Sequence, residues 1–188
     1  MDAIISLDQQ ILEGLYAMRN PEVVQALIWI TELGSTAVIG GLTLSIGLIL
    51  LLRGRVAYCT GLAVSVAGSA VAVFLLKEII HRARPDTIFQ AYLETGSSFP
   101  SGHATMSFAL YGFLTWLAWR LTQRNRWRFA ALAIAILFIG TIGFSRAYLG
   151  VHYVSDVLGG FLIAGVFVWF ATIAVQKVQA LFTTGRSE

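Results

Sequence analysis

The sequence predicts an all-α integral membrane protein, and three observations support this prediction. The chain of 188 residues is 57% hydrophobic and only 12% charged, and its mean hydropathy is +0.75, whereas soluble domains carry about 25% charged residues. Apolar stretches close to the roughly 20 residues that cross a bilayer as a helix recur along the chain. Polar residues gather in the short segments between them. We therefore expect a single membrane-embedded domain, residues 1–188.

The first 20 residues predict a helix that lies along the membrane surface. Apolar residues recur at helical spacing, namely Ile4, Ile5, Ile11, Leu12, Leu15 and Tyr16. Charged and amide residues occupy the other positions, namely Asp2, Asp8, Gln9, Gln10 and Glu13. A helix with one apolar and one polar face is typical of the interface between lipid and water, and we expect the polar face to point to water.

Five longer apolar stretches predict a bundle of about five transmembrane helices within residues 22–180. They are residues 35–52, 56–80, 102–119, 128–144 and 156–175. The preceding segment, 22–33, is too short to span a bilayer. We expect it either to cap the bundle or to extend the first span as a kinked continuation.

The positions of the basic residues predict the orientation of the bundle. Basic residues follow the first span, join the third to the fourth and follow the last span: Arg53, Arg55, Arg120, Arg124, Arg126, Arg128, Lys177 and Arg186. By the positive-inside rule these ends are cytoplasmic. The N-terminus and the loops 81–101 and 145–155 are then external, and the C-terminus is cytoplasmic. This placement explains the net charge of +3 without a nucleic-acid partner.

Three polar clusters, all on the predicted external side, carry residues suited to phosphate transfer. They comprise three cations, two histidines and one carboxylate: Lys77, Arg84, Arg146, His103, His152 and Asp156. Cations can bind the oxyanions of a phosphate, and histidines can act as nucleophile and general acid. We therefore expect these clusters to meet in one pocket.

The first cluster is Lys77 followed by Arg84-Pro85. If the 56–80 helix continues outward, Lys77 and Arg84 lie two turns apart on one face and can bind the same anion. Pro85 then ends the helix. Alternatively, these residues and Arg82 are basic side chains that reach the interface. The neighbouring His81 has no partner at catalytic spacing and is interpreted as peripheral.

The second cluster, Pro100-Ser101-Gly102-His103, directly precedes an apolar helix. Ser101 is a good N-cap, and the backbone N–H groups that follow can bind phosphate. Gly102 allows close approach of the backbone to the anion, and His103 can protonate a leaving oxygen. A simple capped helix start is the alternative, but it gives no reason for a histidine.

The third cluster places His152 four residues before Asp156, after Ser145-Arg146. The carboxylate can accept a hydrogen bond from one imidazole nitrogen and leave the other free to attack phosphorus, while Arg146 neutralises charge on the transferring group. A His–Asp pair that merely anchors a helix end is the alternative.

Metal binding is a second alternative for the histidines, because His103, His152 and Asp156 could supply two nitrogens and an oxygen. The adjacent cations would repel a metal ion but suit a phosphate, so we expect neither a metal nor a cofactor. The single cysteine, Cys59, excludes an intramolecular disulfide and a site built of several cysteines.

Together, K-x6-R-P at 77–85, P-S-G-H at 100–103 and S-R-x5-H-x3-D at 145–156 resemble the three-part signature of the type 2 phosphatidic acid phosphatase superfamily. The resemblance implies metal-independent dephosphorylation of a lipid phosphate. It implies that His152 is the nucleophile and forms a phosphohistidine, that Asp156 positions it and that His103 is the general acid. The implied phosphate-binding residues are Lys77, Arg84, Ser101, Gly102 and Arg146.

The resemblance to bacterial members also implies a location and a substrate class. It implies the inner (cytoplasmic) membrane with an external active site, and a phosphomonoester or pyrophosphate of a membrane lipid as substrate. Undecaprenyl pyrophosphate is favoured, with phosphatidylglycerophosphate or phosphatidic acid next. Substrate choice is expected in loop 86–99, through Phe89, Tyr92, Glu94 and Phe99. A lipid-to-lipid phosphotransferase and a non-catalytic transporter or scaffold are the alternatives, and the oligomeric state stays open.

Overall fold

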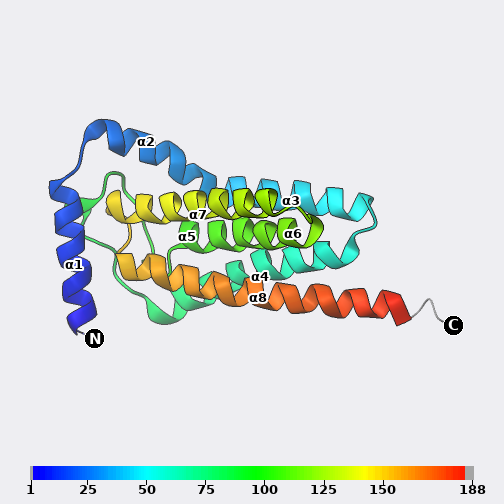
Figure 1. Ribbon diagram of the computed structural model, residues 1–188. Helices are drawn as coiled ribbons and strands as arrows, with labels where there is room; N and C mark the ends of the chain where they lie inside the picture. Colours follow the sequence, from blue (N-terminus) through cyan, green and yellow to red (C-terminus); the bar gives the residue numbers. More distant parts are fainter. Residues whose placement is uncertain (1, 185–188) are drawn as a thin grey trace.

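The structure, a computed structural model, describes residues 2–184, and these residues form helices joined by short connections (Figure 1). The helices are α1 (Asp2–Ala17), α2 (Pro21–Thr31), η1 (Glu32–Gly34), α3 (Thr36–Leu52), α4 (Val56–Ile80), η2 (Thr87–Phe89), α5 (Gly102–Ser107), η3 (Phe108–Gly112), α6 (Phe113–Leu121), α7 (Asn125–Tyr148) and α8 (Val154–Thr184). The predicted all-α fold is confirmed.

Helices α3 to α8 run side by side as a bundle, and α1 lies across one of its ends (Figure 1). Within the described residues, four helical segments are long and apolar enough to cross a membrane: Pro21–Leu52, Val56–Ile80, Asn125–Tyr148 and Val154–Phe182. The remaining expected span, 102–119, falls in the consecutive helices α5, η3 and α6. The number of predicted spans therefore matches the bundle when this interrupted helix is included.

A π-helical turn, η3, separates α5 from α6. Such a turn changes the backbone hydrogen-bond pattern of a helix locally. Here the buried hydroxyl of Ser65 in α4 donates to the carbonyl of Ala109 at 2.7 Å. The interruption is therefore supported by a contact from the neighbouring helix.

The segment 22–33 extends the first span as a kinked continuation, which was one of the two alternatives. Helices α2 and α3 follow each other through the single 3₁₀ turn η1 and form one apolar segment of 32 residues. The hydroxyl of Tyr111 donates to the carbonyl of Leu33 in that turn at 2.9 Å. This hydrogen bond therefore connects the bend at η1 to η3, which continues helix α5 after the second cluster.

Helix α1 turns a different face to the protein than we expected. Its buried residues include Asp8 and Leu12, whereas Ile4 and Leu7 are more than half exposed. We had placed Asp8 on the polar, solvent-facing side, and this was wrong. The physical reason is that Asp8 has hydrogen-bond partners on α8 and on the segment after α4, which offset the cost of burying a carboxylate.

Helix α4 covers the expected span 56–80 but does not continue outward to Arg84. Its last residue is Ile80, and His81 follows in the left-handed conformation with φ of 46°. Lys77 and Arg84 therefore do not share one helical face, an arrangement that we expected only if the helix continued outward. Residues directly before a proline disfavour the α conformation, so the chain leaves the helix before Arg84-Pro85. The exposed His81 is the residue that ends the helix.

The connections rich in arginine, α3–α4 and α6–α7, lie at the end of the bundle away from α1, as does the C-terminal end of α8 (Figure 1). The loops 81–101 and 149–153 lie at the end that α1 crosses. This separation agrees with the predicted grouping of basic and motif-bearing segments. Arg186, one of the predicted cytoplasmic cations, lies outside the described residues.

Candidate active site

The three clusters meet at the end of the bundle that α1 crosses. Two glycines allow the backbone segments to approach closely there. At Gly160 of α8, an added Cβ would lie 2.6 Å from the Thr105 hydroxyl and 3.1 Å from the Ser101 carbonyl, so α5 packs directly on α8. At Gly150, φ is +70° and a Cβ would lie 2.0 Å from the Phe89 carbonyl oxygen. Loop 86–99 therefore passes directly over the turn that carries His152.

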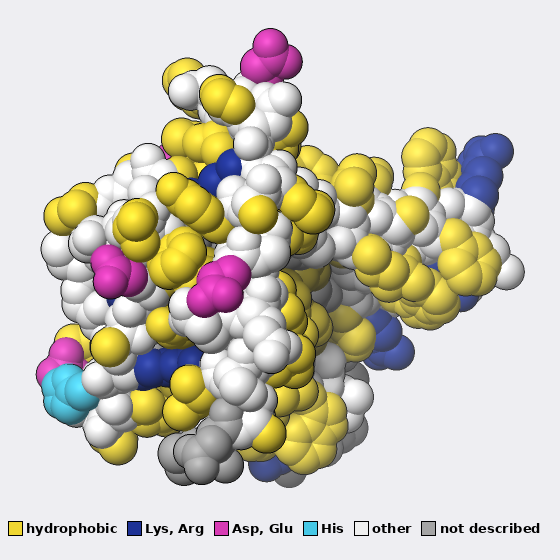
Figure 2. Space-filling view, turned by 90° about the vertical axis from the view of Figure 1, so that its left-hand side faces the viewer, with side chains coloured by type: hydrophobic (Ala, Val, Ile, Leu, Met, Phe, Trp, Pro, Cys, Tyr) yellow, Lys and Arg dark blue, Asp and Glu magenta, His cyan; other side chains and the backbone are white. Residues whose placement is uncertain are grey.

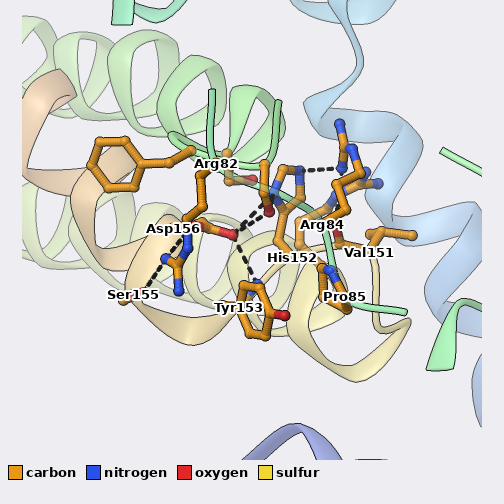
Figure 3. Close-up of polar contacts among 12 residues, drawn as sticks. Arg82, Arg84, Pro85, Val151, His152, Tyr153, Ser155 and Asp156 are labelled. Atoms are coloured by element: carbon orange, nitrogen blue, oxygen red, sulfur yellow. Dashed lines mark hydrogen bonds and ion pairs between the residues drawn. The ribbon is translucent and has the colours of Figure 1, made fainter. Parts of the chain in front are cut away.

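His152 lies between a cation and a carboxylate (Figure 3). Its Nε2 is 3.3 Å from Arg84 Nη1, and its Nδ1 is 3.6 Å from Asp156 Oδ2. Because an arginine can only donate, this arrangement favours the tautomer with its proton on Nδ1, facing Asp156. The lone pair of Nε2 then points to the side on which Arg84 lies.

Asp156 is fully buried and receives hydrogen bonds on both oxygens. Oδ2 accepts from the Ser98 hydroxyl at 2.5 Å and from the backbone N–H of Tyr153 at 2.9 Å. Oδ1 accepts from Arg82 Nη1 at 2.6 Å. A buried carboxylate requires such partners to stay ionised, and they hold the side chain in one orientation beside His152.

Arg84 is oriented by backbone carbonyls. Its Nη1 donates to the Val151 carbonyl at 2.8 Å (Figure 3), and its Nε lies within 3.2 Å of the carbonyls of Thr95 and Gly96. The guanidinium therefore connects the 149–153 turn to loop 86–99. Burial lowers the pKa of Arg84 and the neighbouring Glu94 charge opposes this effect, but an arginine remains protonated at neutral pH.

Arg146, in the last turn of α7, is fully buried. Its Nη1 donates to the hydroxyls of Thr31 at 3.1 Å and of Tyr92 at 2.5 Å, and its Nη2 forms an ion pair with Glu94. The same Glu94 oxygen lies 3.4 Å from Arg84 Nη1. The two arginines that we expected to bind phosphate thus share one carboxylate.

The remaining predicted residues lie close to this centre. Lys77 Nζ donates to the Ser97 carbonyl at 2.5 Å. His103 is near enough to His152, Arg84, Arg146 and Lys77 to interact with all four electrostatically. The backbone N–H of Ser101 donates to the Asp156 carbonyl at 3.1 Å, and an added Cβ at Gly102 would meet open space. The structure therefore brings all eight predicted residues together.

Two buried polar atoms at this site have no hydrogen-bond partner within the described part of the chain. They are Ser101 Oγ and Arg146 Nε. Ser101 is the N-cap of α5 as expected, but its side chain makes no capping hydrogen bond. Buried polar atoms are normally paired, so these two atoms, one from each of two signature motifs, could form hydrogen bonds to a polar ligand.

Burial determines the charge state of His152. Removal from water is the largest effect and lowers the pKa of His152 to about 4, with hydrogen bonding to Asp156 opposing it and the charges of Arg146 and Arg84 adding to it. The imidazole is therefore neutral at neutral pH. A neutral imidazole is the form that can act as a nucleophile.

Sequence reasoning missed Thr31, Arg82 and Ser98, which contact signature residues. It also missed Asp8, which is connected to Asp156 through Arg82. Arg82 was assigned only an interfacial role, although it is a third cation within the first cluster. Asp8 stands four residues before Leu12, so helical spacing alone places the two side chains on one face. Thr31 and Ser98 carry no sequence signal of this kind.

No group of three or more His, Cys, Asp or Glu side chains among the described residues is arranged to hold a metal ion. Metal independence remains a prediction. The end face crossed by α1 shows basic side chains set between apolar ones, with acidic side chains nearby (Figure 2). This mixed surface lies at the end of the bundle where the signature residues meet.

Comparison with known sequences agrees with the signature. Residues 56–180 match the PAP2 superfamily. Phosphatidylglycerophosphatase B of Bacillus subtilis (strain 168) is 32% identical over 171 residues, which cover 90% of this chain and 83% of that protein. Lipid A 1-phosphatase of Rhizobium etli is 33% identical over 128 residues, which cover 63% of this chain but only 50% of that protein.

Solved structures give the same result. The crystal structure of the transmembrane PAP2-type phosphatidylglycerolphosphate phosphatase from Bacillus subtilis superposes with a TM-score of 0.85 at 27% identity, covering 95% of this chain and 89% of that one. Aquifex aeolicus LpxE superposes with a TM-score of 0.68 at 25% identity, covering 90% and 95%. The matched segment and these relatives confirm the resemblance seen in the three motifs, and the chain belongs to the PAP2 superfamily.

Proposed function

We propose that this chain hydrolyses a phosphomonoester or pyrophosphate group of a membrane lipid without a metal ion, through a phosphohistidine on His152. The observation that carries the proposal is the placement of His152 between Arg84 and Asp156. One imidazole nitrogen faces a carboxylate and the other faces a cation, as an activated nucleophile beside an oxyanion site requires.

The reaction has two displacements. In the first, the lone pair of His152 Nε2 attacks phosphorus, the bond from phosphorus to the lipid oxygen breaks, and His103 gives its proton to that oxygen. In the second, water attacks phosphorus, the bond to Nε2 breaks, and His103 takes a proton from the water. Arg84, Arg146 and Lys77 stabilise the negative charge on the transferring group.

The position of the phosphate follows from the residues that Glu94 contacts. Its carboxylate pairs with both Arg84 and Arg146, as a phosphate oxygen would. A substrate phosphate must therefore displace Glu94, after which the arginines bind the phosphate. The unpaired Ser101 Oγ and Arg146 Nε provide further hydrogen bonds.

The relatives bear on the choice of substrate. A curated relative and a solved structure, both from Bacillus subtilis and both similar to this chain over most of its length, are named for phosphatidylglycerophosphate, and the Rhizobium etli relative is named for lipid A. We therefore propose phosphatidylglycerophosphate as the first substrate to test, beside undecaprenyl pyrophosphate, which we favoured from sequence. Loop 86–99 is the segment proposed to discriminate, because Tyr92 and Glu94 already contact Arg146.

The positive-inside rule supports an external active site. The arginine-rich connections lie at the opposite end of the bundle from the signature residues. We propose that the protein spans a bacterial inner membrane several times, with the site and the N-terminus external and the C-terminal end of α8 cytoplasmic.

The test measures inorganic phosphate released by the purified protein from phosphatidylglycerophosphate, undecaprenyl pyrophosphate, phosphatidic acid and lysophosphatidic acid, in the presence of EDTA. We expect release from at least one lipid and its loss in His152→Ala. His81→Ala, at an exposed histidine, is the matched control and should keep full activity. Full activity of His152→Ala would refute the mechanism, and a phosphorylated acceptor lipid with little free phosphate would indicate a phosphotransferase.

A further inference from the structure

Asp8 is a buried carboxylate in the middle of α1, and its contacts link that helix to the site. Only 4% of the residue is exposed. Its Oδ1 accepts from the backbone N–H of Ser155 at 3.0 Å, and its Oδ2 accepts from the Ser155 hydroxyl and from Arg82 Nη2 at 2.7 Å. These donors satisfy both oxygens. Ser155, which supplies two of the three donors, lies in the first turn of α8, which also carries Asp156.

Arg82 continues the connection to Asp156. Its Nη1 donates to Asp156 Oδ1 and to the Ser155 hydroxyl, each at 2.6 Å (Figure 3), and its guanidinium lies over the Tyr153 ring, 4.5 Å from the centroid. The planar guanidinium uses separate nitrogens for the two carboxylates, a geometry that a lysine ammonium cannot reproduce. Burial alone would lower the pKa of Arg82, but the hydrogen bonds and charges of Asp8 and Asp156 raise it.

The two oxygens of Asp156 therefore have different hydrogen-bond partners. Oδ1 is occupied by Arg82, whereas Oδ2 faces His152 Nδ1 and accepts from Ser98 and from Tyr153 N–H. Without Arg82, the carboxylate could rotate about its terminal torsion, which has a broad energy minimum. The orientation of His152 would then be less well defined.

We infer that Asp8 and Arg82 are positioning residues of the phosphatase: Asp8 holds Arg82, and Arg82 holds Asp156 in the orientation that aligns His152. This inference rests on the proposed function and extends it to the N-terminal helix. Neither residue contacts the proposed phosphate site between Arg84 and Arg146. Their effect is therefore on the rate of the chemical step and not on phosphate binding.

The test is steady-state phosphate release by the purified full-length protein and its variants Arg82→Lys and Asp8→Asn. Arg82→Lys keeps the charge but loses the two-nitrogen bridge, and we expect kcat to fall about 10- to 100-fold, because small displacements of a nucleophile carry losses of this size. Asp8→Asn should lower kcat about tenfold. KM and the inhibition constant of vanadate should stay within about twofold. The double variant should lose no more than the worse single variant, because both substitutions break one connection.

Glu13→Gln on the same helix is the matched control, because Glu13 is exposed and accepts a hydrogen bond from Gln9, one helical turn away. Thermal melting and vanadate inhibition show that each variant is folded. Wild-type kcat in folded Arg82→Lys, or losses that multiply in the double variant, would overturn the inference and leave the proposed function intact. If Asp8→Asn does not fold, Arg82→Lys alone decides. Absence of phosphate release by the wild-type protein would refute the proposed function itself.

Discussion

Replacing Glu94 by glutamine should strengthen the binding of phosphate-like anions. The carboxylate of Glu94 pairs with Arg146 and lies 3.4 Å from Arg84 Nη1. An incoming anion must break both contacts before it can bind the arginines. Glutamine has nearly the same shape but no charge, so it competes less strongly for the same donors.

The size of the effect follows from the burial of the three charges. Arg146 is fully buried and the Arg84 side chain is 9% exposed, while the Glu94 side chain is 26% exposed and so is partly solvated. A hydrogen bond to a charged group contributes about 1.5–3 kcal/mol, and partial solvation favours the lower half of that range. A loss of about 2 kcal/mol from the competing carboxylate corresponds to roughly 30-fold tighter anion binding.

The measurement is the inhibition constant of orthovanadate for phosphate release by wild-type protein, Glu94→Gln and a control. Asp86→Asn is the control, because Asp86 is an exposed acid of the same loop that accepts hydrogen bonds from Ile88 N–H and from Thr87. We expect the constant to fall by about 10- to 30-fold in Glu94→Gln and to stay unchanged in Asp86→Asn. An unchanged or larger constant in Glu94→Gln would show that Glu94 does not occupy the anion site.

Three further results are expected. Because burial lowers the pKa of free-enzyme His152 to about 4 and the proposed attack needs the neutral imidazole, protonation of this histidine should reduce kcat/KM only below about pH 4, and an acid-side decline with its midpoint near pH 6.5 would contradict this assignment. Gly150→Ala places a methyl group against a backbone carbonyl at positive φ and should lower Tm by several degrees or more, whereas Gly140→Ala, which faces open space, should not. Ser98→Ala removes a hydroxyl donor from Asp156 and should lower kcat about tenfold without changing vanadate inhibition, and an equal loss in the neighbouring Ser97→Ala would refute a specific role.

The spans could be predicted from sequence because a bilayer requires long apolar helices. The positions at which these helices bend could not. In the 3₁₀ turn after α2, the carbonyl of Leu33 accepts a hydrogen bond from Tyr111, which is 78 residues away in the sequence. In the π-helical turn η3, the carbonyl of Ala109 accepts one from Ser65 of α4. Such contacts depend on which helices become neighbours, and hydropathy carries no information about that.

The proximity of the eight motif residues could be predicted from sequence, and their catalytic and binding roles stay predictions. The eight motif residues follow fixed spacings, and each has a chemistry that phosphate transfer requires. The contacts of Asp8 join it to Arg82 and Ser155, 74 and 147 residues away, so no local pattern reveals them. The position of Arg84 relative to Lys77 could not be predicted for a related reason, because the left-handed His81 ends the helix and Arg84 is oriented by the Val151 carbonyl.

The geometry of the third motif explains how the bundle can hold opposite charges around one histidine. Arg146 lies in the last turn of α7 and Asp156 in the first turn of α8. The partial charges of helix ends stabilise a cation at a C-terminus and an anion at an N-terminus. The short turn 149–153 reverses the chain between these ends, with Gly150 at positive φ, and His152 lies in this turn. The spacing S-R-x5-H-x3-D therefore places His152 in the turn between a cation and a carboxylate, each at the helix end that favours its charge.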